Sequence, residues 1–199
     1  MTAKEHYDNH LGSFYSWSTG DFERNMDSFK SFCVDNEIKP NDSKYAIEVI
    51  NEDIRLVSTY SGLHPDLIVC CGDTLPHLDS FAEVRRLIKD CSDILNSKGK
   101  LILTFRDYST ELVDTNRFVP VKSDSKRILT CFLEYSADKI RVTDLLHELE
   151  NNKWVQKVSS YYKTRITKDL VIGFLKDSGF DIIMDKVENR IITIIGQKN

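Results

Sequence analysis

The chain has 199 residues, 41% of them hydrophobic and 29% charged, which suffices for one α/β domain with a sizeable core but not for two full domains. Its formal net charge of −4 argues against a nucleic-acid partner, because phosphate binding needs a concentrated basic surface. The N-terminus leads to no apolar segment of signal-peptide length, and no window approaches the roughly 18 apolar residues of a membrane span. We therefore expect a cytoplasmic protein with neither nucleic-acid nor membrane partners.

Helices and strands are expected to alternate through the first half of the chain. The predicted elements are a helix from Asp21 to about Ile38, a strand at 45–50, a short helical segment at 56–60, a strand at 66–71, a helix from Ser80 to Gly99 and a strand at 100–105. The strand at 66–71 is a continuous apolar run, typical of a parallel strand covered on both faces. The alternation predicts a parallel α/β sheet.

The second half of the chain predicts antiparallel pairing. Three long segments read as a meander and two short ones as closing strands: 127–135, 139–150 and 153–166, then 180–187 and 190–196. The middle meander segment would also suit a helix, because leucines recur in it at helical spacing. A helix capped by Thr167 and stopped by Gly179 separates the two groups. The closing strands are joined so tightly by Glu188-Asn189 that they must run antiparallel.

The five cysteines show no CxxC spacing. Two of them, Cys70 and Cys71, lie in the apolar strand at 66–71, where small core residues are favoured over metal ligands or a disulfide. The sequence therefore predicts no metal site.

Three local segments carry a family resemblance: the aromatic stretch 14–21, the strand and loop at 66–78, and the strand end at 103–108. In this order, and followed by helix, strand, tight turn and strand, they resemble class I S-adenosylmethionine (SAM)-dependent methyltransferases. The closest resemblance is to small-molecule members related to glycine N-methyltransferase. It implies one domain, residues 1–199, with a Rossmann-like sheet that is parallel except for its last strand. An N-terminal helical lid (1–38) and an antiparallel insertion (about 109–166) complete the expected fold.

The resemblance implies SAM as the cofactor and assigns contacts to it. Asp53 would accept a hydrogen bond from the adenine amino group, and Ile54 would pack on the ring. The backbone at Cys70, Cys71 and Gly72 would meet the methionine part of SAM. Open α/β sheets bind ligands at the carboxyl ends of their strands, so this location also has a physical basis of its own.

Further residues are expected around the reacting methyl group. By the same resemblance, Tyr15 and Trp17 would cover the sulfonium, since a cation over an aromatic face is favourable. Asp73 and His77 would face the methyl donor, and either could accept the proton of an amine acceptor. Plainer roles stay open: packing for the two aromatic residues, a turn cap for Asp73 and a half-buried position for His77.

The methyl acceptor is expected to be a small molecule, either an amine or a carboxylate-bearing metabolite. Arg106 would clamp an anionic group on it, because a guanidinium binds a carboxylate bidentately. Tyr108 follows on the same strand end, and Tyr162 would line the acceptor pocket. Arg106 could instead form an ordinary surface ion pair.

The glycine-rich cofactor loop of the family is absent from this sequence. The predicted first helix ends near Ile38 and the presumed third strand begins near Tyr45, so roughly 50 residues that would carry the first two strands are missing. A deletion, a segment omitted from the sequence as written, and a degenerate relative that serves as an interaction module without binding SAM all remain open. Missing strands would expose a sheet edge and apolar surface, which favours association such as a homodimer.

Overall fold

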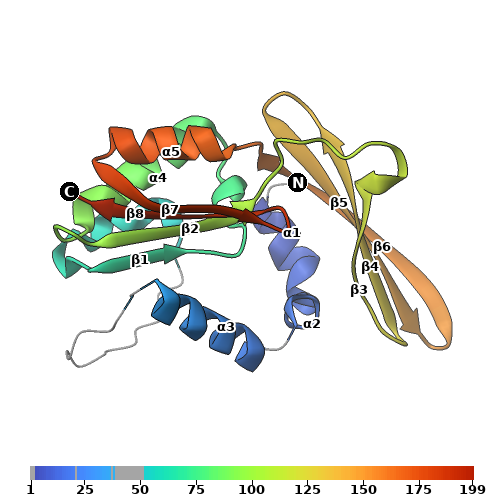
Figure 1. The fold of residues 1–199 in the computed structure, drawn as a ribbon. Coiled ribbons are helices and arrows are strands. Elements are labelled where there is room, and N and C mark those ends of the chain that lie inside the picture. Colours follow the sequence, from blue (N-terminus) through green and yellow to red (C-terminus); the bar gives the residue numbers. More distant parts are fainter. Residues whose placement is uncertain (1–2, 21, 37, 39–51) are drawn as a thin grey trace.

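The computed structural model describes residues 3–20, 22–36, 38 and 52–199, which contain two four-stranded sheets (Figure 1). Sheet A has the order β1-β2-β8-β7 and sheet B the order β3-β4-β5-β6. The strands are β1 (Leu67–Cys70), β2 (Lys100–Arg106), β3 (Phe118–Ser123), β4 (Arg127–Tyr135), β5 (Lys139–Glu150), β6 (Lys153–Thr164), β7 (Phe180–Glu188) and β8 (Ile191–Lys198). The α-helices are α1 (Ala3–Asn9), α2 (Tyr15–Thr19), α3 (Phe22–Asp35), α4 (Phe81–Ile94) and α5 (Lys168–Asp177). Short 3-10 helices are η1 (Leu11–Ser13), η2 (Ile54–Leu63), η3 (Leu75–His77) and η4 (Asp114–Arg117).

Sheet A has the predicted mixture of parallel and antiparallel strands. β1 and β2 are parallel, whereas β8 runs antiparallel to both β2 and β7. The turn between β7 and β8 explains the reversal, because Asn189 and Arg190 have φ angles of 48° and 64°, and two successive left-handed residues suit a tight hairpin. The predicted antiparallel finish is therefore confirmed.

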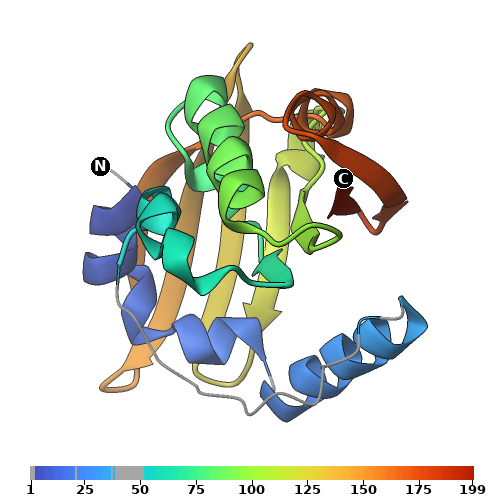
Figure 2. The same ribbon diagram turned by 90° about the vertical axis from the view of Figure 1, so that its left-hand side faces the viewer.

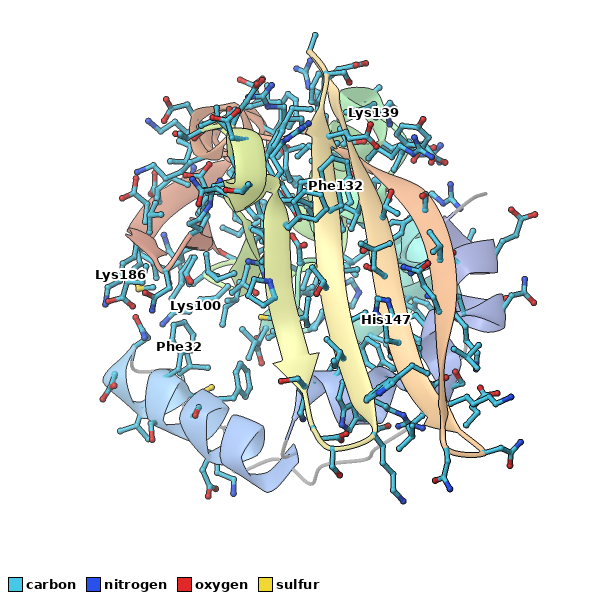
Figure 3. All side chains as sticks on the ribbon, turned by 90° about the vertical axis from the view of Figure 1, so that its right-hand side faces the viewer. Phe32, Lys100, Phe132, Lys139, His147 and Lys186 are labelled. Atoms are coloured by element: carbon cyan, nitrogen blue, oxygen red, sulfur yellow. The ribbon has the colours of Figure 1, made fainter. Side chains whose placement is uncertain are left out.

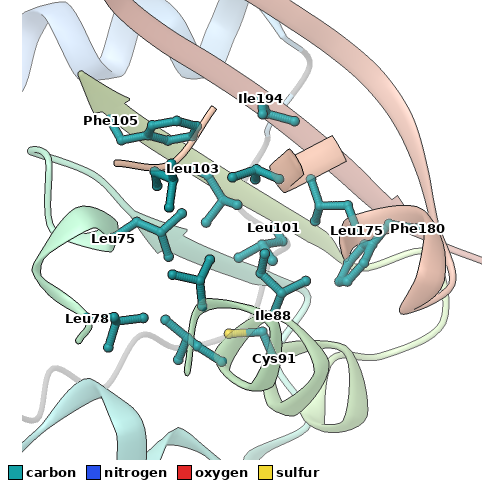
Figure 4. Close-up of a cluster of buried hydrophobic side chains, with 14 of the residues drawn as sticks. Leu75, Leu78, Ile88, Cys91, Leu101, Leu103, Phe105, Leu175, Phe180 and Ile194 are labelled. Atoms are coloured by element: carbon teal, nitrogen blue, oxygen red, sulfur yellow. The ribbon is translucent and has the colours of Figure 1, made fainter. Parts of the chain in front are cut away.

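The main core lies between sheet A and the two helices that cover one of its faces, α4 and α5 (Figure 4). Each helix begins at a capping side chain: Ser80 accepts from the backbone NH of Glu83, and Thr167 accepts from that of Leu170. Such caps satisfy NH groups that the first turn of a helix leaves without partners. The predicted Thr167 cap is confirmed, and Ser80 begins the other helix where the sequence predicts its start.

Sheet B is inserted between β2 and α5 and stands behind α4 when the molecule is viewed from the side of sheet A (Figure 2). The three predicted meander strands are confirmed as β4, β5 and β6. The middle one is a strand and not a helix, because every second side chain from Ile140 to Leu146 is buried. β3 was not predicted; it is short and contains Pro120, which weakens a strand signal.

Of the N-terminal helices α1 and α3, the sequence predicted only α3. The helix predicted from Asp21 is present as α3, whereas α1, which packs against β6, was not predicted. The predicted strand at 45–50 lies outside the described residues. Within those residues no strand pairs with the free edge of β1. None of the described helices has the length and apolar character that crossing a membrane requires.

Replacing Leu101 by Ala tests the core of sheet A. Leu101 is 0% exposed, so we expect the free energy of unfolding in urea to fall by about 2–5 kcal/mol. Leu63→Ala is the matched control, because Leu63 is 71% exposed and its truncation should cost less than about 0.5 kcal/mol. Equal effects of the two substitutions would contradict this packing.

Candidate active site

A pocket of about 370 Å³ opens beside β1, a volume within the range of small-molecule sites. Its walls come from β1 and the residues after it, from η2 and the residues before it, and from α4. The lining residues are Glu52, Asp53, Ile54, Val57, Tyr60, Ile68, Val69, Cys70, Cys71, Thr74, Leu87 and Cys91. The pocket thus brings together four of the predicted cofactor residues: Asp53, Ile54, Cys70 and Cys71.

The thiols in this pocket are neutral. Burial raises the pKa of Cys70 to about 11 and that of Cys91 to about 12, and it also raises the pKa of Cys71. A protonated thiol behaves as a small apolar group, so this side of the pocket suits a flat apolar ligand. Within the described residues no three His, Cys, Asp or Glu side chains are grouped as a metal site requires.

Asp53 lies at the rim of the pocket and begins η2. Its Oδ1 accepts from the backbone NH of Arg55 at 2.9 Å, and its Oδ2 accepts from Arg55 Nη2 at 2.6 Å. The Nε of Arg55 also donates to Asp53 Oδ1, at 2.9 Å. Arg55 therefore holds the carboxylate in place at the rim, while 44% of the Asp53 side chain is exposed.

A sharp turn follows β1 at Gly72 and Asp73, which have φ angles of 77° and 66°. Glycine adopts this left-handed conformation at little cost, and the Gly72 NH donates to Thr104 Oγ1 at 3.1 Å. The turn directs the Asp73 carboxylate toward β2, where Oδ1 accepts from the Arg106 backbone NH at 2.8 Å and Oδ2 accepts from the Tyr108 hydroxyl at 3.3 Å.

Lys163 of β6 supplies the counter-charge of Asp73. Its Nζ forms an ion pair with Asp73 Oδ2, and the lysine is 7% exposed. A lysine rarely becomes this buried unless its charge is paired. The ion pair consequently fixes the loop after β1 to sheet B.

His77 lies on the next turn and faces the same strand of sheet B. Its ring stacks on Tyr161 with centroids 5.5 Å apart. Burial, and secondarily the Lys163 cation, lower the pKa of His77 from 6.5 to about 4. The imidazole is therefore neutral at physiological pH and has one nitrogen able to accept a proton or hydrogen bond.

His6 of α1 also stacks on Tyr161, with ring centroids 4.2 Å apart. It is fully buried, its Nε2 lies 3.0 Å from Asp144 Oδ2, and its Nδ1 lies 2.8 Å from Ser159 Oγ. Asp144 also accepts from Cys131 Sγ at 2.9 Å. These contacts dock the N-terminal helix onto the inner face of sheet B, which is the face turned toward sheet A and the His77 ring.

The structure does not bring every predicted site residue to this region. Trp17 lies against sheet B, where its Nε1 donates to Asp124 Oδ2 at 2.6 Å, and Tyr15 is 45% exposed. Tyr162 points to the opposite side of sheet B from Tyr161 and is 57% exposed. Neither N-terminal aromatic residue lines the β1 pocket.

Arg106 and Tyr108 both contact Asp73, but in different environments. The Arg106 side chain is exposed and forms no ion pair in the part of the chain that the structure describes. Tyr108 is 3% exposed, and burial raises its pKa well above 10, so its hydroxyl stays a neutral donor to Asp73.

Four side chains of the site were missed from the sequence: His6, Asp144, Tyr161 and Lys163. A signal existed for two of them. Asp144 and Lys163 occupy inward positions in alternating strands, Asp144 between Val142 and Leu146. A charged residue on the buried face of a strand needs a partner, which is itself a reason to suspect a site.

No protein-family model and no curated protein matches the chain, but solved structures do. A SAM-dependent methyltransferase from Clostridium acetobutylicum ATCC 824 is 15% identical, with 85% of this chain and 69% of that chain covered and a TM-score of 0.56. CalS10, an amino pentose methyltransferase from Micromonospora echinaspora, is 14% identical, with 67% and 58% covered and a TM-score of 0.56. The CcbJ methyltransferase from Streptomyces caelestis is 8% identical, with 76% and 78% covered and a TM-score of 0.58.

The chain has the class I SAM-dependent methyltransferase fold. These three methyltransferases are only 8–15% identical to the chain, so the likeness establishes the fold and leaves the acceptor unassigned. The narrower resemblance to relatives of glycine N-methyltransferase stays a prediction.

The pKa of His77 predicts how stability depends on pH. Because its pKa is about 4 in the folded chain and 6.5 when unfolded, the unfolded state binds the proton first as pH falls from 6.5 to 4, and stability decreases over that range. We expect His77→Gln to lose less stability than the unmutated chain between pH 7 and pH 4.5 in urea titrations. His147→Gln, on the opposite face of sheet B (Figure 3), should behave like the unmutated chain.

The buried Lys163–Asp73 pair predicts that removing one partner lowers stability more than removing both charges. Lys163→Met leaves a largely buried carboxylate without its cation and should cost about 3–5 kcal/mol of unfolding free energy. Adding Asp73→Asn should recover part of that loss, since the uncompensated charge is removed. Lys157→Met is the control, because Lys157 pairs with Glu148 and Glu150 at an exposed position and should cost about 1 kcal/mol or less. A loss for Lys163→Met no larger than for Lys157→Met would show that the buried pair does not hold the sheets together.

Proposed function

We propose that the protein is a SAM-dependent methyltransferase that acts on a small-molecule acceptor. One observation carries the proposal: four residues assigned to the cofactor from the sequence, Asp53, Ile54, Cys70 and Cys71, line one pocket at the carboxyl end of β1. This edge is where open α/β sheets bind ligands. The methyltransferase fold supports the same reading.

The residues of the β1 pocket fit SAM. Apolar side chains and neutral thiols suit the adenine ring, and the half-exposed Asp53 carboxylate lies at the rim, where it would accept from the adenine amino group. Gly72 follows directly after Cys71, so its backbone can approach a ligand closely without a side chain in the way. When bound, SAM supplies a methyl group already activated by the sulfonium.

The residues around Asp73 would then handle the acceptor. Neutral His77 accepts a hydrogen bond from an amine acceptor and helps to orient its lone pair, while its low pKa makes it a weak proton acceptor. Asp73 already accepts from Lys163, Tyr108 and the Arg106 NH, so we assign it a positioning role. The Arg106 guanidinium is available for an anionic group of the acceptor.

The chain would work as one domain, residues 1–199. The N-terminal segment 1–38 would act as a lid, with His6 as its contact to sheet B, and the insertion 109–166 would supply the acceptor side of the site. Tyr15, Trp17 and Tyr162 are left out of the proposed site because of where their side chains lie. The rate would come mainly from aligning acceptor, methyl group and sulfur in a site shielded from water.

A second candidate function is an interaction module that has lost SAM binding. Its support is the absence of any GxGxG in the sequence, together with the free edge of β1 in the described residues. The two functions make opposite predictions for cofactor binding.

Isothermal titration of the purified chain with SAM and with its demethylated product distinguishes the two functions. We expect SAM to bind at one site. Asp53→Asn should raise the dissociation constant for SAM roughly 10-fold or more, because a hydrogen bond to a charged group contributes about 1.5–3 kcal/mol. Asp79→Asn is the matched control: Asp79 also pairs with Arg55, at 3.4 Å, but lies outside the pocket. A folded, monodisperse sample that binds neither compound would reject the enzyme and favour the interaction module.

A further inference from the structure

Three aromatic rings connect the N-terminal helix with the acceptor side of the candidate site. Tyr161 of β6 stacks on His6 of α1, with ring centroids 4.2 Å apart and an angle of 30° between the planes. It also stacks on His77 of η3, with centroids 5.5 Å apart and an angle of 15°. Aromatic contacts have preferred geometries and are favourable beyond the area that they bury. The plane of the His77 imidazole is therefore linked through Tyr161 to the position of His6.

Both ring nitrogens of His6 contribute to fixing its position. The residue is fully buried, its Nδ1 lies 2.8 Å from Ser159 Oγ, and its Nε2 lies 3.0 Å from Asp144 Oδ2. Asp144 and Ser159 lie opposite each other in β5 and β6, so the imidazole contacts two strands at once. Turning the ring would break a buried polar contact, which is costly because the groups left behind lose their partners. His6 therefore docks α1 on sheet B in one orientation.

One row of side chains on β6 connects this docking point with the loop after β1. Ser159, Tyr161 and Lys163 alternate along the strand and so point to the same face, where all three are buried. Ser159 contacts α1 and Lys163 pairs with Asp73 in the loop after β1, with Tyr161 between them. A residue held on a strand is positioned more precisely than one on a loop. The same rigid strand thus holds both α1 and the loop that leads to His77.

The stack also determines what surrounds His77. Burial is the largest cause that lowers the pKa of this imidazole to about 4, and the Lys163 cation is the second. Asp73 acts in the opposite direction, and His6 acts in the same direction as Lys163. Tyr161 supplies part of the cover over the ring, and α1 in turn packs against β6. Removing that cover would admit water and make the charged imidazole less unfavourable.

We propose that His6 and Tyr161 are positioning residues: α1, docked through His6, holds Tyr161 against His77 and keeps the His77 imidazole in one orientation and shielded from water. The imidazole is then placed to accept a hydrogen bond from an amine acceptor. This role toward an acceptor rests on the proposed function, whereas the link between His6 and His77 is a property of the chain alone. The two claims can therefore fail separately.

Titration of the histidine side chains of the full chain, followed by nuclear magnetic resonance, tests the link without any ligand. In the unmutated chain His77 should stay mostly neutral down to about pH 4.5, since its pKa is about 4. We expect His6→Ala and Tyr161→Leu each to raise the pKa of His77 by about one unit or more toward 6.5, because water reaches the ring. Tyr161→Phe keeps the aromatic ring and should leave that pKa unchanged.

Trp17→Phe is the matched control. Trp17 also joins the N-terminal segment to sheet B, by donating to Asp124 at 2.6 Å, but it does so at the turn between β3 and β4, two strands away from β6. This substitution should leave the pKa of His77 unchanged. An equal rise in Trp17→Phe would overturn the proposal, because general loosening of the N-terminal segment would then explain the effect.

His6→Gln protects the test against a variant that does not fold. Its amide can still contact Ser159 and Asp144, but it has no ring, so the same rise in the pKa of His77 is expected as for His6→Ala. Circular dichroism shows whether each variant is folded. If the pKa of His77 stays at about 4 in folded His6→Gln and Tyr161→Leu, the link does not exist.

Calorimetric titration with SAM separates this proposal from the proposed function. His6 and Tyr161 do not line the β1 pocket, so folded His6→Gln should bind SAM within about 2-fold of the unmutated chain. An unmutated chain that does not bind SAM rejects the proposed function, while the titration of His77 still decides the link. A roughly 10-fold or greater loss of SAM affinity in folded His6→Gln would overturn the assignment of His6 to the acceptor side.

Discussion

A buried ion pair between the two sheets is the interaction on which the candidate site depends. Lys163 belongs to sheet B, and Asp73 belongs to the turn at the end of β1 in sheet A. Removing either charge from water is costly unless the partner stays in place, so separating the sheets at this point is strongly disfavoured. The Arg106 backbone NH and the Tyr108 hydroxyl hold Asp73 from the other side. The position of sheet B is thereby tied to the strand end that borders the pocket, and His77 is brought against Tyr161.

The sequence predicted those parts of the fold whose signals are local. Continuous apolar runs identified β1 and β2, and a two-residue connection was enough to require antiparallel β7 and β8. The ambiguity in β5 arose because its leucines fit both periods, and only pairing with β4 and β6 on both sides selects the strand. α1 was not predicted; the contacts described between it and sheet B belong to His6, and one polar side chain that pairs with a distant strand leaves no periodic signal in the sequence.

The same distinction between local and long-range information explains the site. The family resemblance assigned Asp53, Ile54, Cys70 and Cys71 to the cofactor, and local strand signals placed them at strand ends; the structure brings the four residues into one pocket. The sequence alone does not tell whether Tyr161 or Tyr162 faces sheet A, since facing direction alternates along a strand and depends on register. Lys163 and Asp144 find their partners 90 and 138 positions away in Asp73 and His6, as the residue numbers show, and no periodicity within β5 or β6 identifies those partners.

The face of sheet B that is turned toward sheet A buries polar and charged side chains within an apolar layer. Asp144, Ser159 and Lys163 lie there among buried apolar neighbours such as Val142 and Leu146. Buried polar groups of this kind destabilise a fold unless their hydrogen bonds are satisfied. His6 of α1 satisfies Asp144 and Ser159, and Asp73 of the loop after β1 satisfies Lys163. The partners of these groups therefore come from outside sheet B, and the contacts that satisfy them are the same ones that hold Lys163 and Tyr161 beside Asp73 and His77.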